Sequence, residues 1–357
     1  MPITDTNTMI TPDWQNAYRK AMTDIATGTN YTRTLSALFP APRAYDKDLY
    51  EFERKYSVNG EVPQVLRGGK AIDISGDKSI VYQFDPVIWK LKSGYMQVDL
   101  QRMGFLKGEE RSRESLRAER VAKHIKRIEK SKNTHAIMSI RGGKIALPIY
   151  TGNGDTIYSD QNFGLIWSDS VGAGAFSTRM QTGVTPTSVD WSNSSTKIEA
   201  IQATIMDIFE MFDGKGINTA DLTVYAGKEA WDAIVAKINA FTATTRPGAG
   251  FGYSIDRPDI YTIILGNFTI KRINDTTIIN SVTYKTVEDK YITVMANSNY
   301  HDHVYMTPEL VGFDSPIPNA PREVMNEDED GWYVHTQARH FVCADTNAIC
   351  TLKVVAG

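Results

Sequence analysis

Two histidines near the C-terminal end of the chain have a spacing that could serve a metal site. His301 and His303 flank Asp302, and alternate residues of a β-strand lie on the same face. A zinc site would need a further ligand at a defined spacing, and none follows. His335 and His340 are five positions apart, which puts them on opposite faces of a strand. We interpret the first stretch as a polar loop and the second pair as ordinary sheet residues.

Other short motifs fall short of the chemistry that they resemble. The acidic run at 327–330 lacks the alternating ligands of a calcium loop, so we expect a solvated turn. The glycine pairs at 172–174 and 214–216 lack the spacing of nucleotide-binding loops. Cys343 and Cys350 fit neither a CxxC pair nor a disulfide framework, which favours free buried thiols. No catalytic, cofactor-binding or metal-binding residue is predicted, and we expect no enzyme.

Composition narrows the class of protein. The 357 residues carry a net charge of −3 and are 41% hydrophobic, which is ordinary for a folded protein. The two unpaired cysteines indicate a reduced, intracellular folding environment. No apolar run is long enough to span a membrane, and no signal peptide is visible. A sequence-specific DNA-binding protein would usually be basic overall. A protein that only lines a container filled with DNA need not be basic overall.

Residues 1–60 are expected to form an arm rather than a domain. A helix begins well at Thr11-Pro12, with a capping hydroxyl followed by proline, and ends at Gly28. Scattered prolines follow, so this stretch cannot close its own core and should pack on something else. The apolar stripe of the helix consists of Trp14, Tyr18, Met22 and Ile25.

Residues 61–95 have the pattern of a long hairpin. One strand is expected at 62–67, a turn at 75–77, and a returning strand at 79–84. Arg67 and Lys70 bracket two glycines in a basic interruption of the first strand. The pattern alone fits an ordinary surface hairpin equally well.

A charged helix is expected from about Glu109 to Lys132. The stretch 102–132 contains eleven Lys/Arg and five Glu, and a narrow apolar stripe runs through it. Such a helix would be roughly 35 Å long, which suits a spine that crosses a flat subunit. The basic excess either faces DNA or is a solvated face with ion pairs. The residues for a DNA-facing surface are Arg113, Arg117, Arg120, Lys123 and Arg127.

A mixed α+β module follows a Gly/Ser/Thr-rich stretch at 151–195. A capping box at Thr196 predicts a helix with apolar residues from Ile198 to Phe212, which Gly214 ends. A buried strand at 222–226 precedes a second helix that begins at Gly227. Strands are then expected at 261–265, 268–273, 277–279 and 291–296, and again at 332–336, 338–344 and 348–355.

The order of these elements resembles the Hong Kong 97-type fold of tailed-phage capsid proteins, and within it the lambda-like major capsid protein E family. The resemblance rests on residues 62–68 and 84–86 as two sides of a hairpin called the E-loop, and on 98–104 as the entry to a spine helix. It also rests on 189–191 with Thr196, on 224–233, and on 311–313 with the closing 352–355. It implies an α+β fold with an N-terminal arm (1–60), an E-loop (61–95), a peripheral domain with a spine helix (96–190), an axial domain (191–300), and C-terminal strands of the peripheral domain (301–357).

The resemblance implies a structural major capsid protein of the virion, assembled in the bacterial cytoplasm as hexamers and pentamers into an icosahedral shell around double-stranded DNA. Its implied partners are itself, a portal protein, a separate scaffolding protein, a decoration protein and nonspecifically bound DNA. Two other readings stay open: an encapsulin-like shell around a cargo enzyme, and a monomeric enzyme of about 40 kDa. The residues expected at subunit contacts are Trp14, Tyr18, Met22, Arg67, Lys70 and Lys78.

Overall fold

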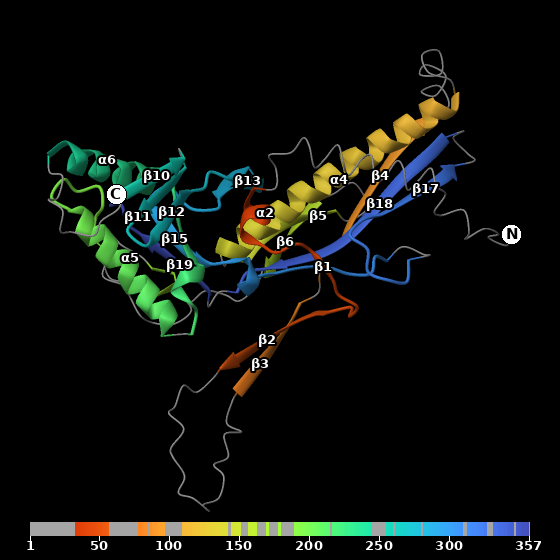
Figure 1. Cartoon of the computed structure of the whole chain (residues 1–357). Helices are drawn as coiled ribbons and strands as arrows, with labels where there is room; N and C mark the ends of the chain where they lie inside the picture. Colours follow the sequence, from red (N-terminus) through yellow and green to blue (C-terminus); the bar gives the residue numbers. More distant parts are fainter. Residues whose placement is uncertain are drawn as a thin grey trace, which may run out of the picture.

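The computed structural model has two halves joined near the middle of the molecule, and a hairpin that projects from one of them (Figure 1). The helices are α2 (Arg33–Leu38), α4 (Glu109–Arg141), α5 (Ile198–Asp213) and α6 (Lys228–Thr244). The structure describes residues 33–56, 78–84, 86, 88–96, 109–141, 144–150, 156–162, 169–170, 178–179, 189–214, 216–244, 255–259, 261–279, 281–309, 313–326, 331–345 and 348–356.

One half is built on an eight-stranded sheet with α5 and α6 beside it (Figure 1). The strand order is β10-β11-β12-β9-β15-β19-β8-β7. The strands are β7 (Asp169–Ser170), β8 (Thr178–Arg179), β9 (Leu222–Ala226), β10 (Ile255–Asp259), β11 (Thr262–Leu265), β12 (Phe268–Arg272), β15 (Tyr291–Ala296) and β19 (Ile349–Lys353).

The core of this half is apolar and confirms the periodicity of α5. The residues of the predicted stripe, from Ile198 to Phe212, are all buried. They pack with Val224 and Trp231 in one large hydrophobic cluster. Gly214 caps the C-terminal end of α5 as expected, but the capping box is wrong. The Thr196 hydroxyl donates to the carbonyl oxygen of Asp190 at 2.6 Å, and Lys197 is the N-cap residue without a side-chain bond.

The other half is a five-stranded sheet with α4 lying along one face (Figure 1). The long central strand β18 pairs with β4 along one edge and with β17 along the other. Beyond the end of β17, β18 pairs with β16, and β1 pairs with β16 in parallel. The strands are β1 (Arg43–Ala44), β4 (Ile88–Met96), β16 (Asp302–Tyr305), β17 (Ala320–Asn326) and β18 (Gly331–Cys343).

Helix α4 begins at Glu109 as predicted but continues past Lys132 to Arg141, for 33 residues. At ~1.5 Å per residue this is about 50 Å. Its last turns are apolar, and Ala136, Ile137 and Ile140 are buried there. The final turns therefore stay helical because they pack against residues of both halves, which the charge pattern of the earlier turns does not reveal.

Several strand predictions are corrected. The expected polar loop at His301–His303 is wrong, because His303 lies in β16 and both histidines are buried. The two strands expected at 332–336 and 338–344 are the single strand β18. The last strand, β19, pairs with β15 in the eight-stranded sheet, not with the other C-terminal strands. Its alternating apolar residues fill the core beside Val294, so pairing follows packing instead of chain order.

Small hairpins complete the described elements. Strands β13 (Thr276–Ile279) and β14 (Val282–Lys285) form one beside α4, and β5 (Lys144–Tyr150) and β6 (Thr156–Asn162) form another. The third is β2 (Tyr50–Tyr56) with β3 (Lys78–Phe84), which projects from the molecule (Figure 1). Its returning strand matches the prediction, but its first described strand lies at 50–56, inside the range expected to be an arm. The strand predicted at 62–67 lies outside the described residues.

Candidate functional site

The predicted subunit-contact residues are mostly outside the described part of the chain. This applies to Trp14, Tyr18, Met22, Arg67 and Lys70, which stay predictions. Lys78 is the first residue of β3 and pairs with Tyr56 near the projecting end of the hairpin. Of this set, the structure thus places one residue, and it lies on the element that extends furthest from the body.

The predicted DNA-facing residues of α4 do not share one surface. Arg117 is 8% exposed and forms an ion pair with Glu323 of β17, so its solvent-facing assignment is corrected. Arg120 is half-buried, whereas Lys123 and Arg127 are exposed. Lys123 also pairs with Glu119. Arg113 belongs to the first turns of α4, where only the backbone is described.

A buried polar anchor fixes the root of the projecting hairpin. Tyr50, the first residue of β2, is 1% exposed, and its hydroxyl donates to the Asp302 carboxylate. Its ring lies 4.7 Å from that of Phe341. Asp302 also pairs with Arg43 at 3.0 Å. Burial raises the pKa of Tyr50, so the hydroxyl keeps the proton that it donates. The hairpin therefore leaves the body from a rigid point.

The pairing of the two strands of the hairpin groups its aromatic residues on one side. Alternate residues of β2 and β3 lie on opposite faces of the pair. By this rule the register assigns one side of the pair to residues that are largely aromatic, namely the partners Tyr50–Phe84, Phe52–Tyr82, Arg54–Ile80 and Tyr56–Lys78. In Figure 1 the strands extend away from both sheets beyond the anchor. An isolated two-stranded hairpin is at best marginally stable in water, so this element calls for a partner surface.

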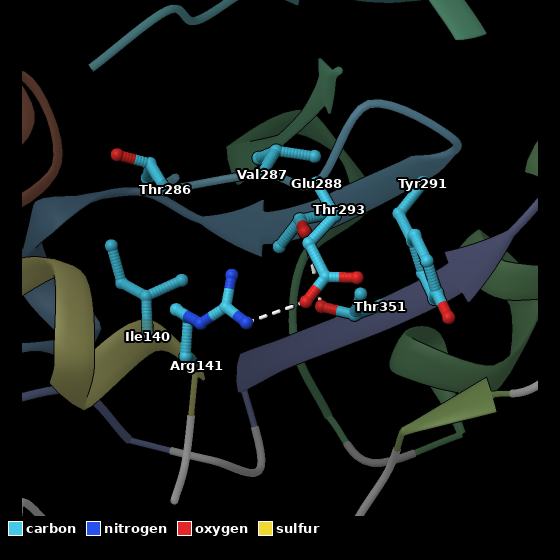
Figure 2. A pocket seen from close by; sticks show the side chains of 8 residues that line it. All are labelled: Ile140, Arg141, Thr286, Val287, Glu288, Tyr291, Thr293 and Thr351. Atoms are coloured by element: carbon cyan, nitrogen blue, oxygen red, sulfur yellow. Dashed lines mark hydrogen bonds and ion pairs between the residues drawn. The ribbon is translucent and has the colours of Figure 1, made fainter. Parts of the chain in front are cut away.

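A pocket lies where the end of α4 meets the eight-stranded sheet (Figure 2). Arg141 reaches into it, forms an ion pair with Glu288, and donates to the carbonyl oxygen of Lys285 at 2.9 Å. The guanidinium carbon also lies 5.5 Å from the Tyr284 ring centroid. The lining residues are Ile140, Arg141, Thr286, Val287, Glu288, Tyr291, Thr293 and Thr351. With its arginine held in this way, the pocket is a joint between the two halves.

A second contact tightens the same joint. An ideal Cβ at Gly227 would lie 1.9 Å from the carbonyl oxygen of Glu288. The turn after β14 therefore rests directly on the backbone between β9 and α6. Nearby, Asp275 accepts hydrogen bonds from the Thr34 amide at 3.1 Å and from the Asn133 side chain at 2.8 Å, which ties α2 and α4 together. These contacts position the halves relative to each other.

The face of the five-stranded sheet away from α4 carries basic residues. The ladders place Lys92 opposite His335, and His335 opposite Arg322. The hydrogen bond between His124 of α4 and Thr336, at 2.9 Å, shows that α4 covers the opposite face. We call the solvent side the outer sheet face; its residues include Lys90, Lys92, Gly94, Met96, Arg322, Val324, Tyr333 and His335.

The sequence did not predict this arrangement. Its basic residues come from β4, β17 and β18; β4 lies far from the other two along the chain, and only the pairing brings its lysines beside His335. His335 was predicted to be an ordinary sheet residue on the face opposite His340, and the structure confirms the opposite faces: His340 is 1% exposed under α4, and His335 is half-buried on the other side. Alternation within each strand was the only available signal, and it does not say which strands are neighbours.

Neither a metal centre nor a membrane span emerges from the part of the chain that the structure describes. Its His, Cys, Asp and Glu side chains form no group of three or more that could hold a metal ion. None of its helices is long and apolar enough to cross a membrane. Cys343 and Cys350 are both buried and neither is in a disulfide, as predicted.

Comparison with known proteins identifies the fold. Neither a family model nor a curated protein matches the chain. A protein described as the capsid protein of an E. coli CFT073 prophage aligns with 97% of this chain and 99% of its own, at 15% identity and a TM-score of 0.51. A capsid chain of cyanophage A-1(L) aligns over 93% and 95%, at 10% identity and a TM-score of 0.50. The SrpI encapsulin of Synechococcus elongatus PCC 7942 aligns over 100% and 92%, at 11% identity and a TM-score of 0.43. The chain has the α+β fold of the first two structures.

Proposed function

We propose that this chain is the major capsid protein of a tailed phage, a non-enzymatic subunit that assembles with its own copies into a closed icosahedral shell around double-stranded DNA. The fold it shares with phage capsid structures supports this role. In the terms of the Hong Kong 97-type fold, the β2–β3 hairpin is the E-loop and α4 is the spine helix. The eight-stranded sheet with α5 and α6 is the core of the axial domain.

The projecting hairpin is the observation that carries the proposal. The residues on one side of its ladder are largely aromatic, and aromatic residues are enriched at protein interfaces. The rigid anchor at Tyr50 holds the hairpin away from its own body, where a neighbouring subunit can receive it. A closed shell needs many such repeated, symmetric contacts. The hairpin then lies over an adjacent copy, with Lys78, Arg67 and Lys70 available for charge pairing.

A capsid role implies further partners. The arm with Trp14, Tyr18 and Met22 packs on an adjacent molecule, and copies group as hexamers and pentamers. A portal protein occupies one vertex, a separate scaffolding protein guides assembly in the bacterial cytoplasm, and a decoration protein binds the finished shell. DNA inside is held through its phosphates without sequence readout.

The alternative is an encapsulin-like compartment that encloses a cargo enzyme. Such a shell would use the same fold and the same hairpin contacts, and the likeness to SrpI does not favour it. The genes beside this one separate the two functions. Terminase and portal genes favour the phage capsid, and a gene for a peroxidase or a ferritin-like protein favours the compartment.

Shortening the hairpin tests the proposal. Phe52 and Tyr82 are directly paired, so an Asn-Gly turn joining them removes the projecting part while keeping the root. The shortened chain should keep its melting temperature and its monomeric size, but should form no shells where the intact chain does. Shells of normal size and yield from the shortened chain would overturn the assigned role of the hairpin.

A further inference from the structure

The outer sheet face has a run of basic residues across three neighbouring strands. Lys92, His335 and Arg322 form one cross-strand row, because His335 pairs with the other two on either side. Adjacent strands are about 4.8 Å apart, so the Cα atoms of Lys92 and Arg322 are roughly 10 Å apart. Their long side chains can both reach a group held above the central imidazole. Lys92 is exposed, and the other two are half-buried.

The row has no acidic counterpart among the described residues. No carboxylate of the described chain forms an ion pair with Lys92, His335 or Arg322, whereas Lys90, further along the same face, pairs with Glu309 at 2.8 Å. Two cations that flank one imidazole and have no acidic partner among the described residues form a suitable site for an anion.

Tyr333, which lies beside the row, holds the side chain of Lys92 in place. The Lys92 ammonium lies 3.7 Å from the centroid of the Tyr333 ring, which holds the lysine over the sheet. Gly94 makes this possible, because a Cβ there would lie 2.9 Å from Cε1 of Tyr333. The ring also lies 6.5 Å from that of His335. The row is thus preorganised on three paired strands and not on a loop.

The electrostatics around His335 agree with an anion site. Burial, then the charges of Lys92 and Arg322, lower the pKa of His335. Among the described residues, the titratable groups that face it are Lys92 from β4, Arg322 from β17 and Tyr333 from β18, and His124 of α4 acts on it from the other side of the sheet. None of these is a carboxylate. An anion above the row would raise the pKa of His335 and would bind more tightly once the imidazole is protonated.

We propose that this row binds the phosphate groups of a nucleic-acid backbone, so that the outer sheet face, and not α4, is the DNA-facing surface of the subunit. This inference rests on the proposed function, because the double-stranded DNA inside the shell is taken to be the polyanion that the row binds. The chain as a whole carries a net charge of −3, so this basic row is a local exception. On α4, by contrast, Arg117 is buried and Lys123 is already paired with Glu119. Contacts to phosphates position DNA without reading its sequence.

Binding of a fluorescent 20-base-pair duplex of mixed sequence to the purified full chain tests the proposal. Lys92→Gln with Arg322→Gln should reduce the slope of log affinity against log salt by about 2 and weaken binding at 50 mM salt roughly ten-fold. The matched control, Arg127→Gln with Lys130→Gln, removes the same charge from the exposed side of α4 and should change affinity less than about two-fold. Lowering the pH from 7.5 to 5.5 should strengthen wild-type binding, and His335→Gln should remove this gain.

Three outcomes would overturn the proposal. Equal losses in both double variants, or a loss in the α4 variant alone, would return the DNA-facing surface to α4. Unchanged DNA binding by the Lys92/Arg322 variant together with failed shell assembly would show that the row accepts carboxylates of a second copy. Displacement of the duplex by inorganic phosphate at an equal phosphate concentration would show a site for the free anion. Shell formation is scored separately by electron microscopy, so a failure to assemble argues against the proposed function without deciding the DNA result.

Discussion

Arg117 of α4 and Glu323 of β17 form an ion pair whose side chains are only 10% and 9% exposed. It fastens the N-terminal half of α4 to the sheet beneath it. Breaking a buried pair by removing one partner is far more costly than replacing both, because the remaining charge stays buried without a counter-ion.

Removal of one partner should therefore destabilise the chain strongly. We expect Arg117→Met to lower the free energy of unfolding by about 3–5 kcal/mol, and Arg117→Met with Glu323→Leu to restore most of the loss. Urea unfolding followed by circular dichroism measures both variants. A double variant as unstable as the single one would show that the pair acts through something other than its charges.

The histidines predict a steep loss of stability in mild acid. Burial lowers the pKa of His124 and His301 to about 4 and that of His135 and His303 to about 3. Their pKa in the unfolded chain is about 6.5, so they are neutral when folded and take up protons on unfolding below that pH. Each contributes stability that is complete above pH 6.5 and falls by about 1.4 kcal/mol per pH unit down to its folded pKa.

Unfolding midpoints in urea at pH 7.5, 6 and 5 test this prediction. His124→Gln should reduce the number of protons taken up on unfolding at pH 5 by about one, since His124 is nearly neutral in the folded chain at that pH. An identical pH slope in the variant would contradict the neutral, buried state of His124.

The anchor of the hairpin gives a graded prediction. Tyr50→Phe removes the hydroxyl donated to Asp302 but leaves that carboxylate its partner Arg43, so we expect a loss of about 1–2 kcal/mol. Tyr50→Ala also leaves a cavity beside Phe341 and should cost about 3–5 kcal/mol. Limited proteolysis at residues 57–77 in the alanine variant should rise if the anchor directs the hairpin. Equal losses for both variants would show that the ring contributes nothing beyond the hydroxyl.

Gly227 tests the close approach at the joint, and Gly214 at the end of α5 is its control. At Gly227 a methyl group would overlap the carbonyl oxygen of Glu288, so Gly227→Ala should destabilise by at least about 1–3 kcal/mol. At Gly214 the backbone is right-handed helical and the nearest atom to an added Cβ is 3.5 Å away. Gly214→Ala should therefore be neutral or stabilising by up to about 1 kcal/mol. Melting temperatures of the two variants measure the difference, and equal shifts would contradict the close approach at Gly227.

Periodic patterns within one helix predict which of its residues are buried. The apolar stripe from Ile198 to Phe212 could be predicted because its residues recur at the helical period and therefore share the buried face of one helix. Arg117 was misassigned as a surface residue, although it lies four positions before Val121 and therefore shares the buried side of α4. That spacing was the available signal, and the surrounding charges obscured it.

Features that depend on contacts between distant parts of the chain could not be predicted from the sequence. The hairpin begins at Tyr50 because that residue packs against Phe341 and bonds to Asp302, both of which lie far away along the chain. The row of Lys92, His335 and Arg322 exists only because β4 and β17 both pair with β18. Periodicity indicates which face a residue occupies in its own strand, but the neighbouring strand is decided by packing of the whole fold.

Negative-stain electron microscopy of the purified chain, expressed alone and together with its candidate scaffolding protein, tests the central proposal most directly. Closed shells, tubes or six-fold capsomers are the predicted result. Uniform particles of about 40 kDa in both preparations, with no assembly at any protein concentration tried, would contradict the capsid function and return the chain to the class of monomeric proteins.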